Sequence, residues 1–157
     1  MVMVKENTIY KLSKRFALRI IHLYVFLRDS QHENVMSRQI YRSGTSIGAN
    51  VAESVFAQSE ADYINKLKIA LKEAGETRYR LELLYEADLI TANAYDSLLN
   101  DVNTIIGTLI NIINKTRLQH YIHIHIIPII NVHIKSRTAT SRLGWYLIIK
   151  IQHQMHI

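Results

Sequence analysis

The chain contains no cysteine and a single proline, Pro128, among its 157 residues. Without cysteine there is no disulfide framework, no thiol nucleophile and no thiolate zinc site, which is compatible with an intracellular compartment. No stretch approaches the roughly 18 consecutive apolar residues that a membrane span requires, and residues 1–16 lack the apolar core and cleavage site of a secretory signal. We therefore expect a soluble, cytoplasmic protein with no membrane span.

Charge is distributed unevenly along the chain. Residues 1–117 hold 15 lysines and arginines against all 13 acids, whereas residues 118–157 hold four basic residues, no acid and six of the eight histidines. The net charge of +6 is therefore largely a property of the second segment. This change in composition predicts one domain over residues 8–117, followed by a basic tail rich in isoleucine and histidine over residues 118–157.

Four amphipathic helices are predicted before residue 118, because apolar residues recur there at steps of three and four. Asn7 or Thr8 can cap the first helix, Ser59 with Asp62 forms a capping-box pattern at the head of the third, and Thr91 can cap the fourth. The connections are short and the helices contain no proline. These features predict an all-α fold, an antiparallel up-down four-helix bundle with a C-terminal extension of uncertain order.

The apolar stripes define the expected core. The third helix alternates steps of four and three, which is typical of a bundle seam. The fourth helix carries one seam and, beside it, a second apolar stripe that an isolated bundle would leave in water. Neighbouring subunits are the simplest cover for that stripe, and the tail folding back is the competing explanation. The expected core is Ile9, Leu12, Phe16, Ile20, Leu23 and Leu27 in the first helix, Tyr63, Leu67, Ala70, Ala74, Thr77, Leu81 and Leu84 in the third, and Tyr95, Leu98, Val102, Ile105, Leu109 and Ile112 in the fourth; the second stripe is Leu99, Ile106, Ile110 and Ile113.

The second helix, predicted over about residues 37–57 after a loop at residues 29–34, contains the run SGTSIGANVAES. Its polar residues share one face, and its small residues, Gly44 and Gly48 with Ala49 and Ala52, let another helix backbone come close. Partly buried charges on this helix would need partners on the third helix. The pattern predicts a polar network that fixes the register of the bundle, with a ligand site as the alternative. The expected network comprises Arg42, Ser43, Ser46, Asn50, Glu53, Glu73, Glu76 and Arg80.

A resemblance to a known family rests on QIYRSGTSIGANVAES, then ADYINKLKIALKEAGETRYRLELLYEADLI, then a final amphipathic helix. Over about residues 8–117 the chain resembles the bacterial four-helix-bundle family of 23S ribosomal RNA intervening-sequence proteins, also called S23 proteins. The resemblance implies a small bundle that assembles as a homopentamer and has no assigned molecular function. A more distant similarity links it to accessory proteins of retroelement reverse transcriptases, which engage RNA and the polymerase.

The signature of that family maps onto the two central helices. Arg80 departs from it, because a tryptophan commonly follows the tyrosine there, and we expect this guanidinium to face Glu76. The tail beyond residue 118 has no counterpart in the family. The matching positions are Arg42, Ser43, Ser46, Ile47, Ala49, Asn50 and Glu53, followed by Ala70, Lys72, Glu73, Ala74, Glu76, Tyr79, Leu81 and Leu84.

Three catalytic patterns are absent from the sequence. The run GTSIGAN has neither the preceding strand nor the Gly-Lys-Ser/Thr of a phosphate loop. Nothing ties His22 or His32 to a serine nucleophile, and the acids Glu73, Glu76 and Glu82 lack the Glu-x-x-His repeats of di-metal bundles. We expect no catalytic residue, metal, cofactor or small-molecule substrate.

The tail alternates isoleucine with histidine over residues 122–126. On a strand, His123 and His125 would share a face with metal-ligand spacing. The first interpretation is nevertheless a segment that is poorly ordered or foreign to the domain, because it has no acid and no helical period. A nucleic-acid or membrane-surface arm and a metal site are the alternatives. Its candidate nucleic-acid contacts are Lys135, Arg137, Arg142 and Lys150.

The sequence favours a non-enzymatic oligomeric scaffold that binds RNA or a nucleoprotein partner. The alternative is a purely structural or protein-binding module with no nucleic-acid role, for which the near-neutral bundle is the main argument. The expected partner is the chain itself, as a pentamer by the resemblance, in a ring whose interface includes Leu99, Ile106, Ile110 and Ile113.

Overall fold

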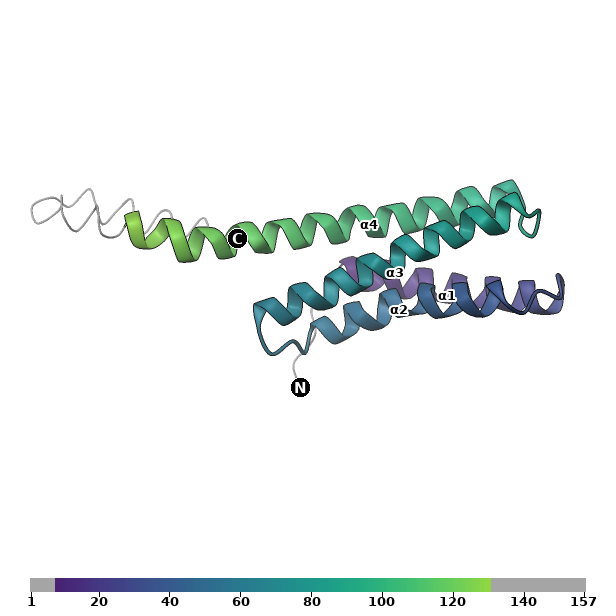
Figure 1. Ribbon diagram of the computed structural model, residues 1–157, viewed down its shortest axis with the longest axis horizontal. Coiled ribbons are helices and arrows are strands. Elements are labelled where there is room, and N and C mark those ends of the chain that lie inside the picture. Colours follow the sequence, from purple (N-terminus) through teal and green to yellow (C-terminus); the bar gives the residue numbers. More distant parts are fainter. Residues whose placement is uncertain (1–7, 131–157) are drawn as a thin grey trace, which may run out of the picture. The chain divides into compact units, whose positions relative to one another are not determined.

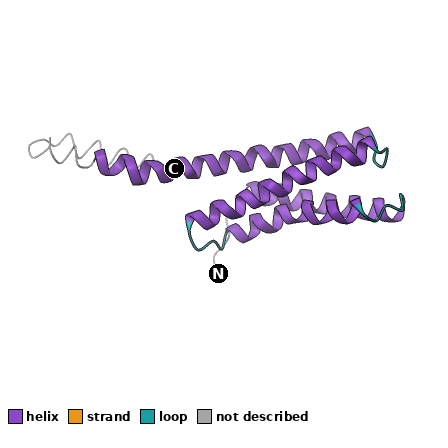
Figure 2. Cartoon of the chain, in the orientation of Figure 1, coloured by secondary structure: helices purple, strands orange, loops and turns teal. Residues whose placement is uncertain are grey.

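Four helices joined by short loops make up the described part of the chain, residues 8–130 of a computed structural model (Figure 1, Figure 2). They are α1 (Thr8–Asp29), α2 (Met36–Ser54), α3 (Glu60–Glu86) and α4 (Ala92–Tyr121), and α4 continues into a π-helical stretch, η1 (Ile122–Ile126). Successive helices of the bundle run in opposite directions (Figure 1). The predicted all-α, antiparallel up-down bundle is confirmed, and residues 8–130 contain no strand.

The chain divides into two compact units, Met1–Asn114 and Lys115–Ile157. The bundle core lies in the first unit. The prediction that helical structure ends before residue 118 is wrong, since α4, η1 and a further helical turn extend it to residue 130. Residues 115–127 contain no glycine or proline, so nothing interrupts the backbone hydrogen bonding there. The strand considered for residues 122–126 is likewise wrong, and Lys135, Arg137, Arg142 and Lys150 lie outside the described residues.

The core is built from the predicted stripes with two shifts of register. All of the predicted positions from Leu67 to Leu84 on α3 are buried. On α1, Ser13 is buried and Leu12 only partly, because α2 approaches too closely there for a larger side chain. On α4, Ile113 rather than Ile112 is buried, since a straight helix drifts by about 20° per heptad relative to a 3.5-residue repeat.

α2 approaches its neighbours α1 and α3 more closely than other helix pairs of the bundle approach one another. A Cβ atom on Gly44 would lie 2.7 Å from Cγ1 of Ile20, and one on Gly48 would lie 3.5 Å from the carbonyl oxygen of Ser13. Ile20 is fully buried and β-branched, so it has no room to move aside. The expected close approach at these two glycines is confirmed, and the partner helix is α1.

Side chains and backbone groups in the loops fix where the helices begin. Ser59 Oγ accepts a hydrogen bond from the Asp62 N–H at 3.1 Å, and Thr91 Oγ1 accepts one from the Ala94 N–H at 3.3 Å, so both predicted caps are confirmed. Of the two candidate caps of the first helix, Thr8 is the first residue of α1 and Asn7 lies outside the described residues.

The carboxylate of Glu33 caps α2, which sequence reasoning missed. It accepts hydrogen bonds from the backbone N–H groups of Val35, Met36 and Ser37 at 2.8, 2.8 and 2.6 Å. Burial alone would raise the pKa of this carboxyl, but these hydrogen bonds outweigh burial, so the pKa is lowered from its ordinary value. Glu33 thus satisfies three of the amides that a helix leaves without internal partners.

Candidate interaction surfaces

One buried hydrogen bond joins α2 to α3. The Thr77 and Ser43 hydroxyls are hydrogen-bonded to each other at 2.9 Å, and Thr77 Oγ1 also lies 2.8 Å from the Glu73 carbonyl while Ser43 Oγ lies 3.4 Å from the Ile40 carbonyl. Both side chains are buried. Ser43 is therefore the member of the expected network that faces the third helix inside the core, where its partner is Thr77.

The charged members of the expected network are on the surface rather than inside. Arg42 and Glu53 are both exposed, so the expectation that they are partly buried is wrong. Glu53 pairs with Lys66 at 2.6 Å, at the edge of the α2–α3 contact, and this carboxylate raises the pKa of the lysine ammonium. Burying two unpaired charges in an apolar contact costs more desolvation free energy than the packing of their side chains gains. At the edge of the contact both charges stay hydrated.

The remaining polar residues of that set are used within single helices. Arg80 Nη1 lies 3.1 Å from Glu76 Oε2, one helical turn away, which confirms the expected pairing. The Asn50 amide donates to the Ser46 carbonyl at 2.9 Å. Among the described residues, no hydrogen bond or ion pair joins Arg42, Ser46, Asn50 or Glu73 to a side chain of the facing helix.

A second polar cluster, which sequence reasoning also missed, joins α1 to α4. Arg19 Nη1 lies 2.6 Å from Asp101 Oδ2 and also donates to the Ser97 carbonyl at 3.2 Å, while Nη2 donates to Ser97 Oγ at 2.8 Å. Arg15 adds a longer contact with Asp101 at 3.4 Å. The sequence contains two basic residues with i, i+4 spacing, Arg15 and Arg19, and two possible acceptors with the same spacing, Ser97 and Asp101. It does not show that these two pairs face each other.

An apolar stripe follows the side where α3 and α4 meet. Tyr85 of α3 stacks on Tyr95 of α4, with ring centroids 4.6 Å apart. Leu71 and Ile64 lie two and three heptads before Tyr85, so they share its side of α3, and residues 99, 106 and 110 follow Tyr95 along α4 at helical spacing. The α3–α4 stripe is defined as Ile64, Leu71, Leu99, Ile106 and Ile110.

The exposure of this stripe corrects the predicted interface. Ile113 belongs to the core of the bundle and is only 5% exposed. Leu99 and Ile106 pack partly against the core, and Ile110 remains 41% exposed. The surplus apolar surface is therefore smaller than the sequence suggested, and it is shared by α3 and α4 rather than confined to the fourth helix.

Two glycines beside this stripe have no close packing neighbour among residues 8–130. Gly75 of α3 and Gly107 of α4 are exposed, and a Cβ atom at either position would meet no atom of the described part of the chain within 4 Å. Glycine in a helix interior is less favourable than alanine by about 0.5–1 kcal/mol. These positions lack the compensating close contact that Gly44 has.

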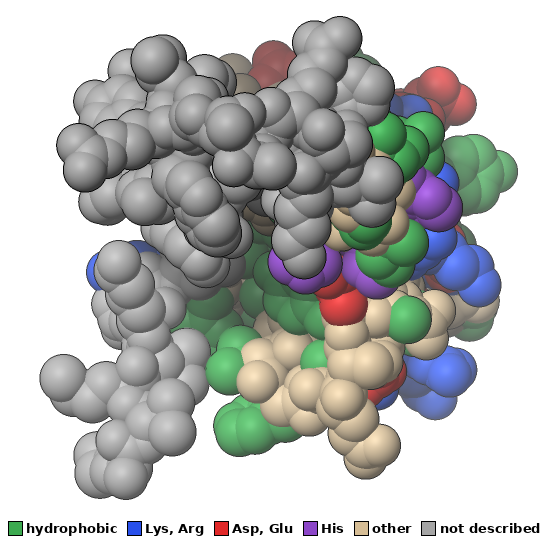
Figure 3. Space-filling model, turned by 90° about the vertical axis from the view of Figure 1, so that its left-hand side faces the viewer, with side chains coloured by type: hydrophobic (Ala, Val, Ile, Leu, Met, Phe, Trp, Pro, Cys, Tyr) green, Lys and Arg blue, Asp and Glu red, His purple; other side chains and the backbone are tan. Residues whose placement is uncertain are grey.

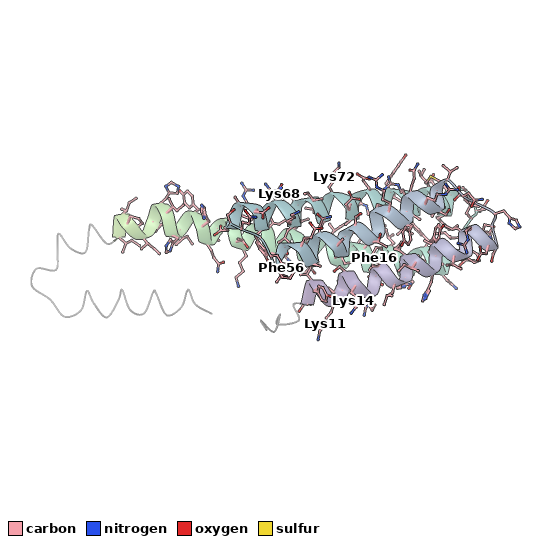
Figure 4. All side chains as sticks on the ribbon, turned by 90° about the horizontal axis from the view of Figure 1, so that it is seen from below. Lys11, Lys14, Phe16, Phe56, Lys68 and Lys72 are labelled. Carbon is pink, nitrogen blue, oxygen red and sulfur yellow. The ribbon has the colours of Figure 1, made fainter. Side chains whose placement is uncertain are left out.

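The two halves of the bundle carry opposite charge. Residues 8–54, with α1 and α2, hold seven basic residues and three acids, whereas residues 60–114, with α3 and most of α4, hold five basic residues and nine acids. Figure 4 shows Lys11 and Lys14 pointing away from the bundle on α1, and Lys68 and Lys72 on α3. Most cations of α3 pair with carboxylates: Lys66 with Glu53, Lys72 and Arg80 with Glu76, and Arg78 with Glu82.

Aromatic and basic side chains gather where α1 meets α2. The rings of Tyr24 and Tyr41 lie 5.0 Å apart, and the guanidinium of Arg28 lies 5.4 Å from the Tyr24 ring while it pairs with Asp29. Arg38 lies about one turn before Tyr41, and Arg42 directly follows Tyr41. Both arginines are exposed. We define the tyrosine–arginine surface as Tyr24, Arg28, Arg38, Tyr41 and Arg42.

Within residues 8–130, no three histidine, cysteine or acidic side chains gather closely enough to hold a metal ion. His123 and His125 lie on the helical stretch η1, where two residues with i, i+2 spacing do not point to the same side as they would on a strand. No helix in this part of the chain is both long and apolar enough to span a membrane. Residues 8–114 therefore form a helical bundle whose candidate functional features are two surfaces, the α3–α4 stripe and the tyrosine–arginine surface.

Comparison with known proteins agrees with that class. The family described as 23S rRNA-intervening sequence protein matches residues 5–111, so the chain belongs to this family. A solved protein of unknown function from the S23 ribosomal protein family of Bacteroides thetaiotaomicron is 55% identical, with a TM-score of 0.69. The match covers 99% of that protein and 71% of this chain, and no curated protein matches.

Proposed function

We propose that the protein is a non-enzymatic scaffold that assembles with copies of itself. The observation that carries this proposal is the α3–α4 stripe, in which Ile110 is exposed and a Cβ atom on either of two neighbouring glycines would touch none of the described residues. Exposed glycine next to exposed apolar side chains is what a closely approaching helix of another subunit requires. The proposed assembly is a closed ring, for which five subunits are favoured by the family.

The outer face of α1 is the proposed partner of this stripe. Leu18 and Val25 lie seven residues apart on that face and are 52% and 42% exposed, and Lys11 and Lys14 share it. Opposite charge on the two surfaces supports the pairing, because the α1–α2 half is basic and the α3–α4 half acidic. Two different surfaces in contact make a heterologous interface, which closes into a ring by rotation.

Light scattering at micromolar concentration tests the assembly. We expect a defined multimer for the full chain, and a lower mass after Ile110→Lys or Leu18→Lys. Val35→Lys is the matched control, since Val35 is an exposed apolar residue of the α1–α2 loop outside both surfaces. A monomeric wild-type protein would refute the assembly, and a dimer would refute the ring.

RNA binding is the second part of the proposal, and the tyrosine–arginine surface supports it. Arginines beside an exposed tyrosine suit single-stranded RNA, because guanidinium groups contact phosphates while aromatic rings stack on bases. Arg38 and Arg42 make no ion pair with the described residues, in contrast to most cations of α3. The tail residues Lys135, Arg137, Arg142 and Lys150 remain further proposed contacts, as does a role in binding a nucleoprotein.

A salt-dependent RNA shift assay separates this proposal from the purely structural alternative. Affinity for a single-stranded RNA should fall steeply with salt, and Arg38→Gln with Arg42→Gln should flatten that dependence. Lys68→Gln with Lys72→Gln removes the same charge from α3 and serves as the control. Truncation after Arg117 shows how much binding comes from the tail. No shift at low salt for the full chain would favour the structural module.

A further inference from the structure

Phe56 is an aromatic residue that the bundle leaves in solvent. It lies in the turn between α2 and α3 and is 80% exposed, beside Val55, which is also exposed. Its backbone N–H donates to the Glu53 carbonyl at 2.9 Å, which any residue except proline could do. The turn therefore gives no reason for a large apolar side chain here. Figure 3 looks onto this end of the bundle and shows apolar side chains among the polar ones.

A pocket of about 440 Å³ opens between α1 and the start of α4. Its walls are mainly apolar and include Leu23, Phe26, Ile90 and Leu98, while Arg19 and His22 also line it. This volume lies within the usual range for binding pockets, about 300–1,000 Å³, and is large enough for an aromatic side chain.

Phe56 and this pocket belong to opposite ends of the bundle. The turn with Phe56 precedes α3, the loop that contributes Ile90 follows it, and the 27 residues of α3 span about 40 Å. Phe56 therefore cannot reach the pocket of its own chain. The charges next to the two features are complementary. Glu60 and Asp62 follow Phe56 in the first turn of α3, whereas beside the pocket two arginines, Arg15 and Arg19, share the single carboxylate of Asp101, and His22 also lines the wall.

We propose that Phe56 of one copy inserts into the pocket between α1 and α4 of a second copy. The aromatic ring and Val55 fill the apolar walls, and the acids of the first turn of α3 lie near Arg19 and His22. This contact uses neither the α3–α4 stripe nor Leu18 and Val25 of α1, so it goes beyond the proposed ring. Because its two sides differ, it is heterologous and can be repeated from copy to copy.

The absence of cysteine makes a direct test possible. Gln58→Cys with Asn93→Cys places one thiol in the turn beside Phe56 and one next to the pocket residue Ala94, and both changes leave the proposed contact intact. Mild oxidation at micromolar concentration should give a ladder of covalent oligomers on a non-reducing gel. The pair Val35→Cys with Asn93→Cys controls for random collision and should react at least ten-fold more slowly.

Adding Phe56→Ser to the cysteine pair should abolish the ladder, and because Phe56 is exposed this change leaves the fold intact. Adding Ile110→Lys instead should preserve the ladder while lowering the mass of the non-covalent assembly, so failure of the ring and failure of this contact are distinguishable. The proposal is wrong if the ladder is absent, if it survives Phe56→Ser, or if the Val35 pair reacts equally fast.

Discussion

Two glycines lie on α2, and one lies on the outer surface of each of α3 and α4. The α2 pair and the other pair have different surroundings. Gly44 and Gly48 face α1, with Ile20 and Ser13 close against them, whereas Gly75 and Gly107 face open space. In α2 the helix-propensity cost of glycine is offset inside the chain by close packing. In α3 and α4 the described residues, 8–130, offer no such compensation, and the proposed assembly would supply it through a neighbouring copy.

Alanine substitutions at these glycines should have opposite effects on stability, and this is the largest difference that we expect. Gly44→Ala forces a Cβ atom against the buried Ile20 and should lower the free energy of unfolding by about 1–3 kcal/mol. Gly75→Ala meets no atom of the described residues, so it should raise the free energy of unfolding of the dissociated subunit by about 0.5–1 kcal/mol while it weakens the proposed assembly. Urea denaturation of both variants measures the two changes. An unchanged free energy of unfolding for Gly44→Ala would show that α1 and α2 can move apart at this position without loss of stability.

The buried hydroxyl pair offers a second way to test the close contact of α2. Thr77→Val keeps the shape of the side chain but leaves Ser43 without its hydrogen-bond partner on α3, and it should cost about 1–3 kcal/mol. The double variant Ser43→Ala with Thr77→Val should lose less than the sum of the two single changes, because it leaves no unpaired hydroxyl. Thr104→Val on the exposed side of α4 is the control. Strictly additive losses would mean that the hydroxyls do not interact.

The repeat of apolar residues was enough to predict four helices and nearly all of the core, because one buried face per helix follows from spacing alone. The spacing did not predict Ser13 and Ile113 in place of Leu12 and Ile112, since the neighbouring helix decides which of two adjacent residues is covered. The cluster of Arg19 and Asp101 was missed for a related reason: it depends on how two helices are placed, which no single stripe reveals.

The expected polar network shows the same limit at the candidate site. Ser43 was correctly placed on the side of α2 that faces α3, but Arg42 and Glu53 were expected in that contact and are exposed. A helical face wide enough to hold all of these residues reaches from the core to the solvent. The spacing of residues in the sequence therefore predicts which face of a helix they share. How deeply each side chain is buried depends on how closely the neighbouring helix approaches.

The cap formed by Glu33 makes the start of α2 sensitive to pH. Because the pKa of this carboxyl is lower in the folded protein, its contribution to stability is present above the ordinary value of 4.5 and is lost as pH falls through the folded pKa. Glu33→Gln should cost about 1 kcal/mol at neutral pH. The difference from wild type should shrink in acid, where both side chains are uncharged. Thermal denaturation between neutral and acidic pH tests this, and a constant difference would exclude the carboxylate as the cap.

The smallest effect should come from the surface pair that also joins α2 to α3. Glu53 and Lys66 meet at 2.6 Å, but the Glu53 side chain is mostly exposed, so solvent screens the attraction and the two long side chains lose entropy on pairing. Glu53→Ala should therefore change the denaturation midpoint less than Thr77→Val does, although both remove a contact between the same helices. The change should also fade in 1 M salt, where the screening length is only about 3 Å. An effect of Glu53→Ala as large as that of Thr77→Val, and insensitive to salt, would place this carboxylate inside the α2–α3 contact and restore the network that the sequence first suggested.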